Sequence, residues 1–187
     1  TVTGSSGNDR FDFQGNLAAT DVIAGGEGTD TLVILGDAFA STTTAITGIE
    51  TLEIDSDTAA DNFNFALFGT PADISTVNID VLLNNDAVTL TDTQASTYGI
   101  TVPTTANTAV TLAGATIDLL DSSGSADAIT LNLTNPQLGT AGNANAMAVT
   151  ALTANGIETI TINADSSTTT TTSLADDITI GTLNSST

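Results

Sequence analysis

Glycine and aspartate are spaced near the start of the chain in a way that suits a hard metal ion. Residues 25–33 read Gly-Gly-Glu-Gly-Thr-Asp-Thr-Leu-Val. Glycine lets the backbone curl until carbonyl oxygens converge, and Asp30 adds a carboxylate at the sixth position of the segment. Ca²⁺ takes about six to eight oxygen ligands of these kinds. The segment therefore predicts a calcium-binding turn, and Leu32 should begin a strand that points into a core.

A second copy of this pattern lies upstream. Residues 4–12 read Gly-Ser-Ser-Gly-Asn-Asp-Arg-Phe-Asp, with Ser5 in place of the second glycine. Asp9 of this copy precedes Asp30 by 21 residues, and a degenerate turn around Asp21 lies between them. Alternate turns of a roll lie on one side, so we expect Asp9 and Asp30 to face one ion and Asp21 to lie opposite. The glycines expected to shape the two turns are Gly4, Gly7, Gly26 and Gly28.

The charge of the chain limits its partners. Its 187 residues include 22 acids and one base, Arg10, for a net charge of -21. Nucleic acid and anionic membranes need a basic face, so the charge excludes both as partners, and no apolar run is long enough to insert into a bilayer. Eighteen of the acids are Asp, the carboxylate of turns and compact calcium sites. A halophilic surface would explain the charge without any ion, but not the spacing of Asp9 and Asp30.

Short alternating stretches predict β-strands. One phrase recurs at residues 49–55, 74–80 and 157–163, where it reads Ile-Glu-Thr-Leu-Glu-Ile-Asp in the first copy. Several spacings are near 20 to 21 residues, the length of one solenoid coil. We therefore predict an all-β fold, a parallel β-solenoid (β-roll or β-helix) of roughly nine coils with loop insertions. An antiparallel sandwich would give similar strands, but hairpin dipeptides such as Asn155-Gly156 are scarce.

Aspartates recur before the later strands as well. Each could hold a further ion, or could cap its turn through the backbone, and the sequence leaves both readings open. The candidates for further ligands are Asp61, Asp86 and Asp127, together with Asp55, Asp57 and Asp177.

The two nonapeptides, residues 4–12 and 25–33, resemble the repeats of the RTX family of type I-secreted bacterial proteins. Downstream phrases such as Gly-Ile-Glu-Thr and Ser-Ala-Asp-Ala-Ile-Thr-Leu resemble RTX-type surface-layer proteins. The resemblance implies a secreted β-solenoid that binds Ca²⁺ in Asp/Gly-rich turns and assembles with copies of itself into a lattice on the cell surface. It also implies that residues 1–36 form the calcium-binding turns, that residues 37–187 continue the solenoid, and that the chain is part of a larger protein.

Catalysis finds little support in the composition. Cysteine and histidine are absent, which removes thiolate nucleophiles, imidazole bases and disulfides. No carboxylate pair stands out for glycoside hydrolysis, and one Tyr with no Trp offers little for stacking on sugar. We therefore expect a structural, non-enzymatic module. An RTX adhesin segment that binds a surface or glycan is the first alternative, and a secreted carbohydrate-active enzyme is the second.

Overall fold

The fold is built from parallel β-strands. The computed structural model describes residues 1–18, 20–35, 45–55, 61–67, 73–80, 86–101, 109–135, 146–166 and 178–186. In these ranges there is no α-helix, a 3₁₀ turn η2 spans Phe65–Leu67, and every strand pair is parallel. The prediction of an all-β fold with short parallel strands is therefore confirmed, and the antiparallel sandwich is wrong.

The strands form three sheets. The three-stranded sheet contains β1 (Val2–Thr3), β3 (Val22–Ala24) and β5 (Ala45–Thr47). The seven-stranded sheet contains β2 (Arg10–Gln14), β4 (Thr31–Leu35), β6 (Thr51–Asp55), β8 (Thr76–Asp80), β10 (Thr97–Thr101), β12 (Ala128–Asn135) and β14 (Thr159–Ser166). The five-stranded sheet contains β7 (Asp61–Asn64), β9 (Asp86–Thr93), β11 (Val110–Leu119), β13 (Met147–Asn155) and β15 (Ile178–Ser186).

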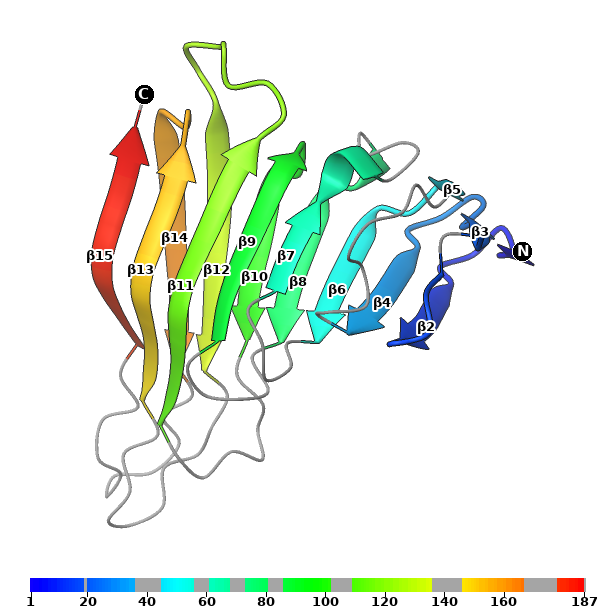
Figure 1. Cartoon of the computed structure of the whole chain (residues 1–187), viewed down its shortest axis with the longest axis horizontal. Helices are drawn as coiled ribbons and strands as arrows, with labels where there is room; N and C mark the ends of the chain where they lie inside the picture. Colours follow the sequence, from blue (N-terminus) through cyan, green and yellow to red (C-terminus); the bar gives the residue numbers. More distant parts are fainter. Residues whose placement is uncertain are drawn as a thin grey trace.

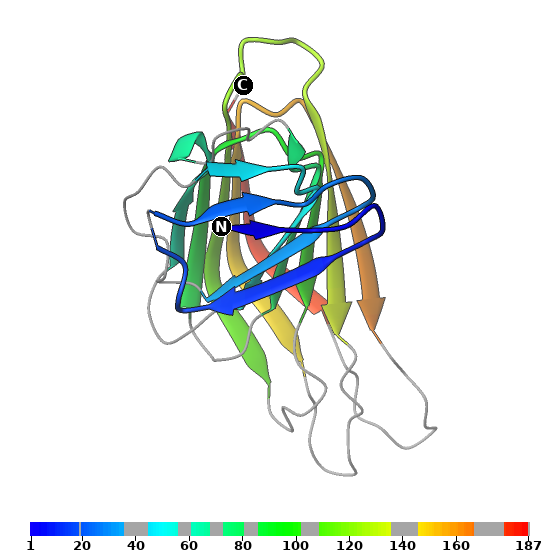
Figure 2. The same cartoon turned by 90° about the vertical axis from the view of Figure 1, so that its right-hand side faces the viewer.

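The chain winds as a solenoid. Even-numbered strands all join the seven-stranded sheet, and odd-numbered strands join one of the other two, so that each coil supplies one strand to each side. Figure 1 shows the coils stacked along one long axis from the N-terminus to β15, and Figure 2 shows the same stack from its N-terminal end. The described residues hold seven such strand pairs and then β15.

The coils become wider along the axis, which corrects the expectation of nine. Asp9 and Asp30, on neighbouring coils, are 21 residues apart, whereas Asp127 and Glu158 are 31 apart. Strand β2 has 5 residues and β11 has 10. Longer strands and longer connections use up the chain, so fewer coils form than a constant repeat of about 20 residues predicts.

Alternating aliphatic side chains fill the space between the sheets. In β6 and β8 the inward positions are buried and the outward ones are partly exposed, as period-two strands require. The recurring phrase pairs in register, with Leu52 opposite Val77 and Ile54 opposite Ile79. One continuous apolar core runs from Phe11 to Ile157. Within the described ranges, no helix is long and apolar enough to cross a membrane.

Candidate metal sites

The two nonapeptide turns stack directly on each other. Both lead into the seven-stranded sheet, Asp9 before β2 and Asp30 before β4. The backbone N–H of Asp9 donates to Oδ1 of Asp30 over 2.8 Å, and the N–H of Asp30 donates to Oε2 of Glu50 over 2.8 Å. Each carboxylate therefore caps an amide of the preceding coil. This ladder aligns successive turns and places Asp9 beside Asp30, as the spacing predicts.

Glycine is required in these turns for two separate reasons. Gly26 and Gly28 have φ angles of 114° and 128°, a region that is strained for residues with a Cβ. Gly25 is needed because of close approach: a Cβ there would overlap the carbonyl oxygen of Gly48 and Oδ2 of Asp30. The carboxylate of Asp30 and a backbone carbonyl thus lie against the same small space beside Gly25.

The first turn repeats this arrangement with one difference. A Cβ on Gly4 would overlap the carbonyl oxygen of Gly25 and crowd Oδ2 of Asp9. Oδ2 of Asp9, however, accepts hydrogen bonds from the N–H of Ser5 at 2.6 Å and from its Oγ at 3.0 Å. Ser5 is the residue that departs from the nonapeptide pattern. Its N–H and its hydroxyl together occupy the oxygen that a cation would otherwise bind.

Asp30 has no such partner on Oδ2. The residue is 0% exposed, and its Oδ2 is buried with no hydrogen bond. Gly26 stands where Ser5 stands in the first turn, and it has no hydroxyl to offer. An unpaired polar atom is costly to bury, and a charged one more so. In Asp30, therefore, Oδ1 accepts the hydrogen bond from the N–H of Asp9, and Oδ2 has no hydrogen-bond partner.

Among the described residues Asp30 shares an unpartnered buried carboxylate oxygen only with Asp127, whereas the buried hydroxyl of Thr93 is satisfied. Thr93 is also 0% exposed, and its Oγ1 accepts hydrogen bonds from the N–H of Ala95 at 3.2 Å and from the hydroxyl of Tyr98 at 3.3 Å. Tyr98 also donates to the carbonyl oxygen of Ala95 at 2.8 Å. Burial raises the pKa of Tyr98 to about 12, so its hydroxyl stays neutral.

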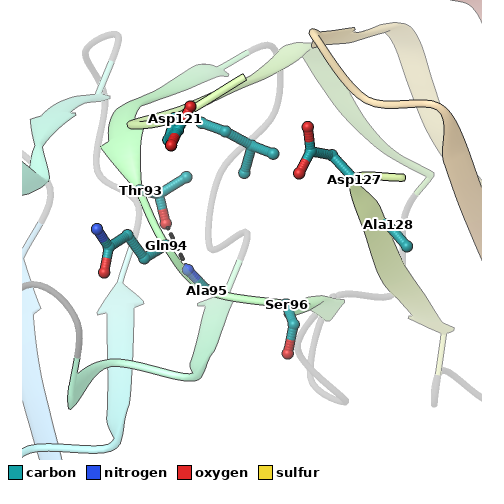
Figure 3. A pocket seen from close by; sticks show the side chains of 8 residues that line it. Thr93, Gln94, Ala95, Ser96, Asp121, Asp127 and Ala128 are labelled. Carbon is teal, nitrogen blue, oxygen red and sulfur yellow. Dashed lines mark hydrogen bonds between the residues drawn. The ribbon is translucent and has the colours of Figure 1, made fainter. Parts of the chain in front are cut away.

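Asp127 repeats part of the Asp30 arrangement further along the solenoid. Its N–H donates to Oε2 of Glu158 over 2.8 Å, and its Oδ2 is buried without a hydrogen-bond partner. A Cβ on Gly124 would crowd both oxygens of this carboxylate. Asp127 also lines an open hollow with Asp121, whose carboxylate accepts hydrogen bonds from Ser123 that lower its pKa (Figure 3).

The recurring Gly-Ile-Glu-Thr phrase explains this repetition. Glu50 and Glu158 occupy the same place in the phrase, and each accepts a hydrogen bond from the amide of an Asp one coil earlier. The glycines that open the phrase, Gly48 and Gly156, both have positive φ angles, 60° and 67°. The Glu of this phrase therefore accepts a hydrogen bond from the N–H of an Asp whose own Oδ2 has no hydrogen-bond partner.

The other predicted ligands do not join these turns. Asp21 lies before β3, on the opposite side of the coil from Asp9 and Asp30, and its Oδ2 accepts a hydrogen bond from the N–H of Ala18 at 2.8 Å. Asp61 and Asp86 begin β7 and β9 of the five-stranded sheet. The remaining two, Asp57 and Asp177, lie outside the described residues.

Gly7 has a supporting position in the first turn. Its N–H donates to Oγ of Ser5 at 3.2 Å, and a Cβ on Gly28 of the next coil would crowd the carbonyl group of Gly7. The glycines of the two turns thus stack on each other at van der Waals distance.

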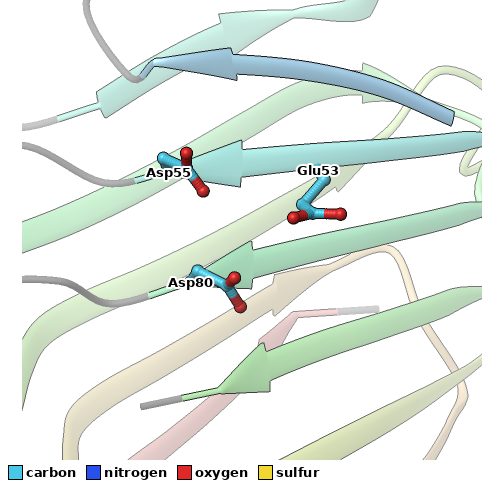
Figure 4. A group of neighbouring side chains, drawn as sticks. All are labelled: Glu53, Asp55 and Asp80. Carbon is cyan, nitrogen blue, oxygen red and sulfur yellow. The ribbon is translucent and has the colours of Figure 1, made fainter. Parts of the chain in front are cut away.

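A separate acidic cluster lies on the outer side of the seven-stranded sheet. Glu53 and Asp55 from β6 and Asp80 from β8 place carboxylate oxygens within 4.8 Å of one another, so they could hold a metal ion (Figure 4). Partial burial and the charges of Glu53 and Asp55 raise the pKa of Asp80. The three groups repel one another, and a cation would relieve that repulsion.

Strand β2 supplies protein groups that already engage this cluster. Arg10 pairs with both oxygens of Glu53, at 2.5 and 2.8 Å, and the ion pair raises the pKa of Arg10. Gln14 donates to Oδ2 of Asp55 over 3.1 Å. Both contacts span the intervening strand β4. Arg10 and Gln14 therefore compensate part of the negative charge that a cation would otherwise neutralise.

Sequence reasoning named Asp55 but missed Glu53 and Asp80. The signal was present, because residues 49–55 and 74–80 carry the same phrase and parallel pairing in register places Asp55 opposite Asp80. Period-two alternation then directs Glu53 to the same face as Asp55.

Comparison with known proteins gives no relative. No family model matches the chain, and neither the curated proteins nor the solved structures contain a significant match.

Proposed function

We propose that this chain is a calcium-binding structural module of a secreted bacterial surface protein, one that assembles with its own copies into a cell-surface layer. The observation that carries the proposal is the open oxygen of Asp30. A fully buried carboxylate with an unpartnered Oδ2 beside a backbone carbonyl suits a hard cation. Asp30 and the carbonyl oxygen of Gly48 would hold the ion, and Asp127 would hold a second one.

The charge supports calcium as a folding partner. With 22 acids and one base, the folded chain repels itself strongly. A cation that binds the folded turns and not the open chain stabilises the fold by about 2.7 kcal/mol per site at a hundredfold excess over Kd. This increment is a large share of an ordinary folding free energy of about 5 to 15 kcal/mol. Calcium would therefore be part of the fold rather than an addition to it.

Secretion follows from the same argument. Extracellular calcium modules bind with Kd values of about 10⁻⁴ to 10⁻³ M, so such sites stay empty in a cytosol kept low in calcium and fill outside the cell. The chain would cross the envelope unfolded, then fold and assemble outside.

Two substitutions test the metal assignment in opposite directions. Asp30→Asn keeps an oxygen for the amide of Asp9 but removes the charge, so it should eliminate one ion by native mass spectrometry and the matching rise in melting temperature on adding calcium. Ser5→Gly restores the full nonapeptide in the first turn and removes one of the two hydrogen bonds to Oδ2 of Asp9, the one from the hydroxyl, so it should strengthen calcium binding. Asp21→Asn, an equal charge change in a turn with its own hydrogen bond, is the control and should change neither.

Wild-type protein that melts at one temperature in chelator and in millimolar calcium would contradict the proposal. An ion count that survives Asp30→Asn would contradict the assignment of the site while leaving other sites open to test.

A surface-binding segment of an adhesin is the second candidate, and one observation favours it. The pairing register places a threonine at the same outward position on six successive strands of the seven-stranded sheet, at Thr31, Thr51, Thr76, Thr97, Thr130 and Thr161. Such a row of hydroxyls at the strand spacing of about 4.8 Å could contact an ordered glycan. Competitive sugar binding on a glycan array would favour this candidate over the surface-layer module.

A further inference from the structure

A hollow lies where the solenoid becomes wider. Thr97, the first residue of β10, pairs with Thr130 of β12, whereas β12 already begins at Ala128. The turn before β12 therefore projects past the turn before β10, and the hollow, of about 240 Å³, lies between these turns and the end of β11. Its lining consists of residues 93–96, Leu119, Asp121, Asp127 and Ala128.

The same step interrupts the ladder of carboxylates and amides. In the narrow coils Oδ1 of Asp30 accepts a hydrogen bond from the N–H of Asp9, which lies one coil earlier. Asp127 donates its own N–H to Glu158 of the following coil, but its carboxylate is directed toward the hollow (Figure 3). Its Oδ2 is buried and has no hydrogen-bond partner. Burying such an oxygen is costly unless a ligand reaches it.

A cation suits this carboxylate, and the chain has none to offer. Its one basic residue, Arg10, pairs with Glu53 on the outer side of the seven-stranded sheet. Asp121 lies on the facing side of the hollow, and hydrogen bonds from Ser123 lower its pKa, so it adds a second negative charge (Figure 3). A divalent ion from solution is therefore the fitting partner. Ca²⁺ accepts an irregular set of oxygen ligands more readily than Mg²⁺ does.

The hollow differs from the Asp30 turn in being open to solvent. Asp30 is 0% exposed, whereas Gln94, Ser96 and Asp121 are exposed. Ca²⁺ takes about six to eight oxygen ligands, and a carboxylate at the wall of an open hollow leaves some of these positions to water. Structural and catalytic zinc sites differ in the same way, because the second kind keeps a position for an outside ligand. An ion at Asp127 would likewise be able to bind an outside ligand.

Charge and size identify the class of that ligand. The net charge of -21 repels anions, and a cationic ligand would compete with the ion. A neutral molecule with two adjacent hydroxyl groups avoids both problems and supplies hard oxygen ligands. The volume of about 240 Å³ lies below the range of about 300 to 1,000 Å³ for drug-sized ligands, so the hollow admits one sugar ring. Gln94 and Ser96 can form hydrogen bonds with further hydroxyls, and Leu119 offers an apolar contact for the ring.

We propose that this hollow is a calcium-dependent binding site for a single neutral sugar, in which an ion held by Asp127 takes two adjacent hydroxyls of the sugar as ligands. The inference deepens the proposed function, since it rests on an ion at Asp127 and gives that ion a ligand. It differs from binding at the threonine row, which lies on the outer face of the seven-stranded sheet and needs no ion at Asp127.

The test is calorimetric titration of the chain with mannose, galactose and fucose, which present adjacent hydroxyls in different geometries. All titrations are made in calcium, because the proposed function makes the fold depend on it. We expect at least one of the sugars to bind at one site per chain. Asp127→Asn should weaken this binding by at least about tenfold, since the ion loses a charged ligand, and should lower the ion count by one in native mass spectrometry.

A second variant guards against misfolding of the first. Ser96→Lys changes an exposed residue of the hollow and brings an ammonium group to the place of the ion, so it should also abolish sugar binding while circular dichroism stays unchanged. Asp165→Asn is the matched control, because it removes one exposed carboxylate from β14, outside the hollow. It should alter neither the sugar affinity nor the ion count.

The possible failures are distinguishable. Binding of none of the three sugars, or binding that survives both Asp127→Asn and Ser96→Lys, would overturn the proposal. If the ion count falls in Asp127→Asn but no sugar binds to the wild type, only the sugar ligand is wrong. An ion count that is unchanged in Asp127→Asn would contradict both the ion and the sugar in the hollow, while calcium at Asp30 would stand.

Discussion

The first and last coils of this solenoid differ in the width of their core. At the N-terminal end the strands are short, and neighbouring turns are joined by carboxylates that accept hydrogen bonds from backbone amides, as between Asp30 and Asp9. At the C-terminal end the strands have 8 to 10 residues and carry few charges. There, side chains such as Leu152 and Ile129 fill the space between the sheets.

The difference shows what a narrow coil lacks. A 5-residue strand such as β6 directs only two side chains inward, Leu52 and Ile54, while β12 directs four inward. Apolar burial is worth about 25 cal/mol per Å², so each narrow coil gains less from its core. Turn hydrogen bonds, and in our proposal calcium, supply the remainder. Wide coils gain more from their core, although Asp127 and Glu158 repeat the same turn hydrogen bond there.

The largest expected effect separates a buried position of the wide coils from an exposed one. Leu152→Ala removes a fully buried side chain and should lower the free energy of unfolding by about 2 to 5 kcal/mol. Leu183→Ala, the next position in the same column, is 51% exposed in this chain and should cost less than about 1 kcal/mol. Urea denaturation of the 187-residue chain measures both. Equal costs would mean that Leu183 is as well packed as Leu152.

A smaller effect distinguishes a glycine in a crowded turn from a glycine in a strand. Gly25→Ala places a Cβ against the carbonyl oxygen of Gly48 and the carboxylate of Asp30, so it should cost about 1 to 3 kcal/mol and remove the calcium response. Gly114→Ala in β11 meets only a carbonyl oxygen at 3.8 Å, so it should be neutral or stabilising by up to about 1 kcal/mol. Thermal melts with and without calcium measure both changes. Similar losses in the two variants would show that the narrow turns are not specially crowded.

The structures of the narrow and the wide coils could not be predicted equally well from the sequence. In the narrow coils the glycine and aspartate spacing placed Asp9 and Asp30 on the same side of neighbouring coils, where they lie side by side, while their sharing of one ion stays a prediction. It did not reveal that Ser5 satisfies Asp9, since a hydroxyl in a turn can point several ways. Parallel strands were predictable from the repeated phrases, but the number of coils was not, because strand length changes along the axis.

The aspartates that recur before the strands were misleading for the same reason. An Asp followed by alternating apolar residues opens β2 and β12 on one side of the solenoid, after Asp9 and Asp127, and β7 and β9 on the other, from Asp61 and Asp86. These segments have similar local sequences, so we expected them to form the same kind of turn. Which sheet each strand joins is a property of the whole coil, and the local pattern does not encode it.

The smallest expected effect concerns the acidic cluster on the narrow coils and its dependence on pH. The pKa of Asp80 in the folded chain is raised by burial and by the charges of Glu53 and Asp55, while Arg10 lowers it less. Between the unfolded and the raised folded pKa, the folded state binds more protons than the unfolded state. The contribution of Asp80 to stability therefore falls as pH rises through this window, and above it the ionised carboxylate opposes folding. Asp80→Asn should remove this dependence and stabilise the chelated protein at neutral pH by less than about 1 kcal/mol, because the group is partly solvated.

A bound cation should reverse the sign of that substitution. A divalent ion at the cluster favours the ionised carboxylate, so in calcium Asp80→Asn should lose its advantage or become destabilising. Asp92→Asn removes the same charge from the five-stranded sheet and is the matched control for the loss of a carboxylate. Denaturation of the wild type and both variants in urea from about pH 4 to pH 7, in chelator and in calcium, measures these effects. If Asp80→Asn and Asp92→Asn behave alike in both conditions, the cluster holds no ion, and the calcium dependence of the narrow coils must come from the stacked glycine turns.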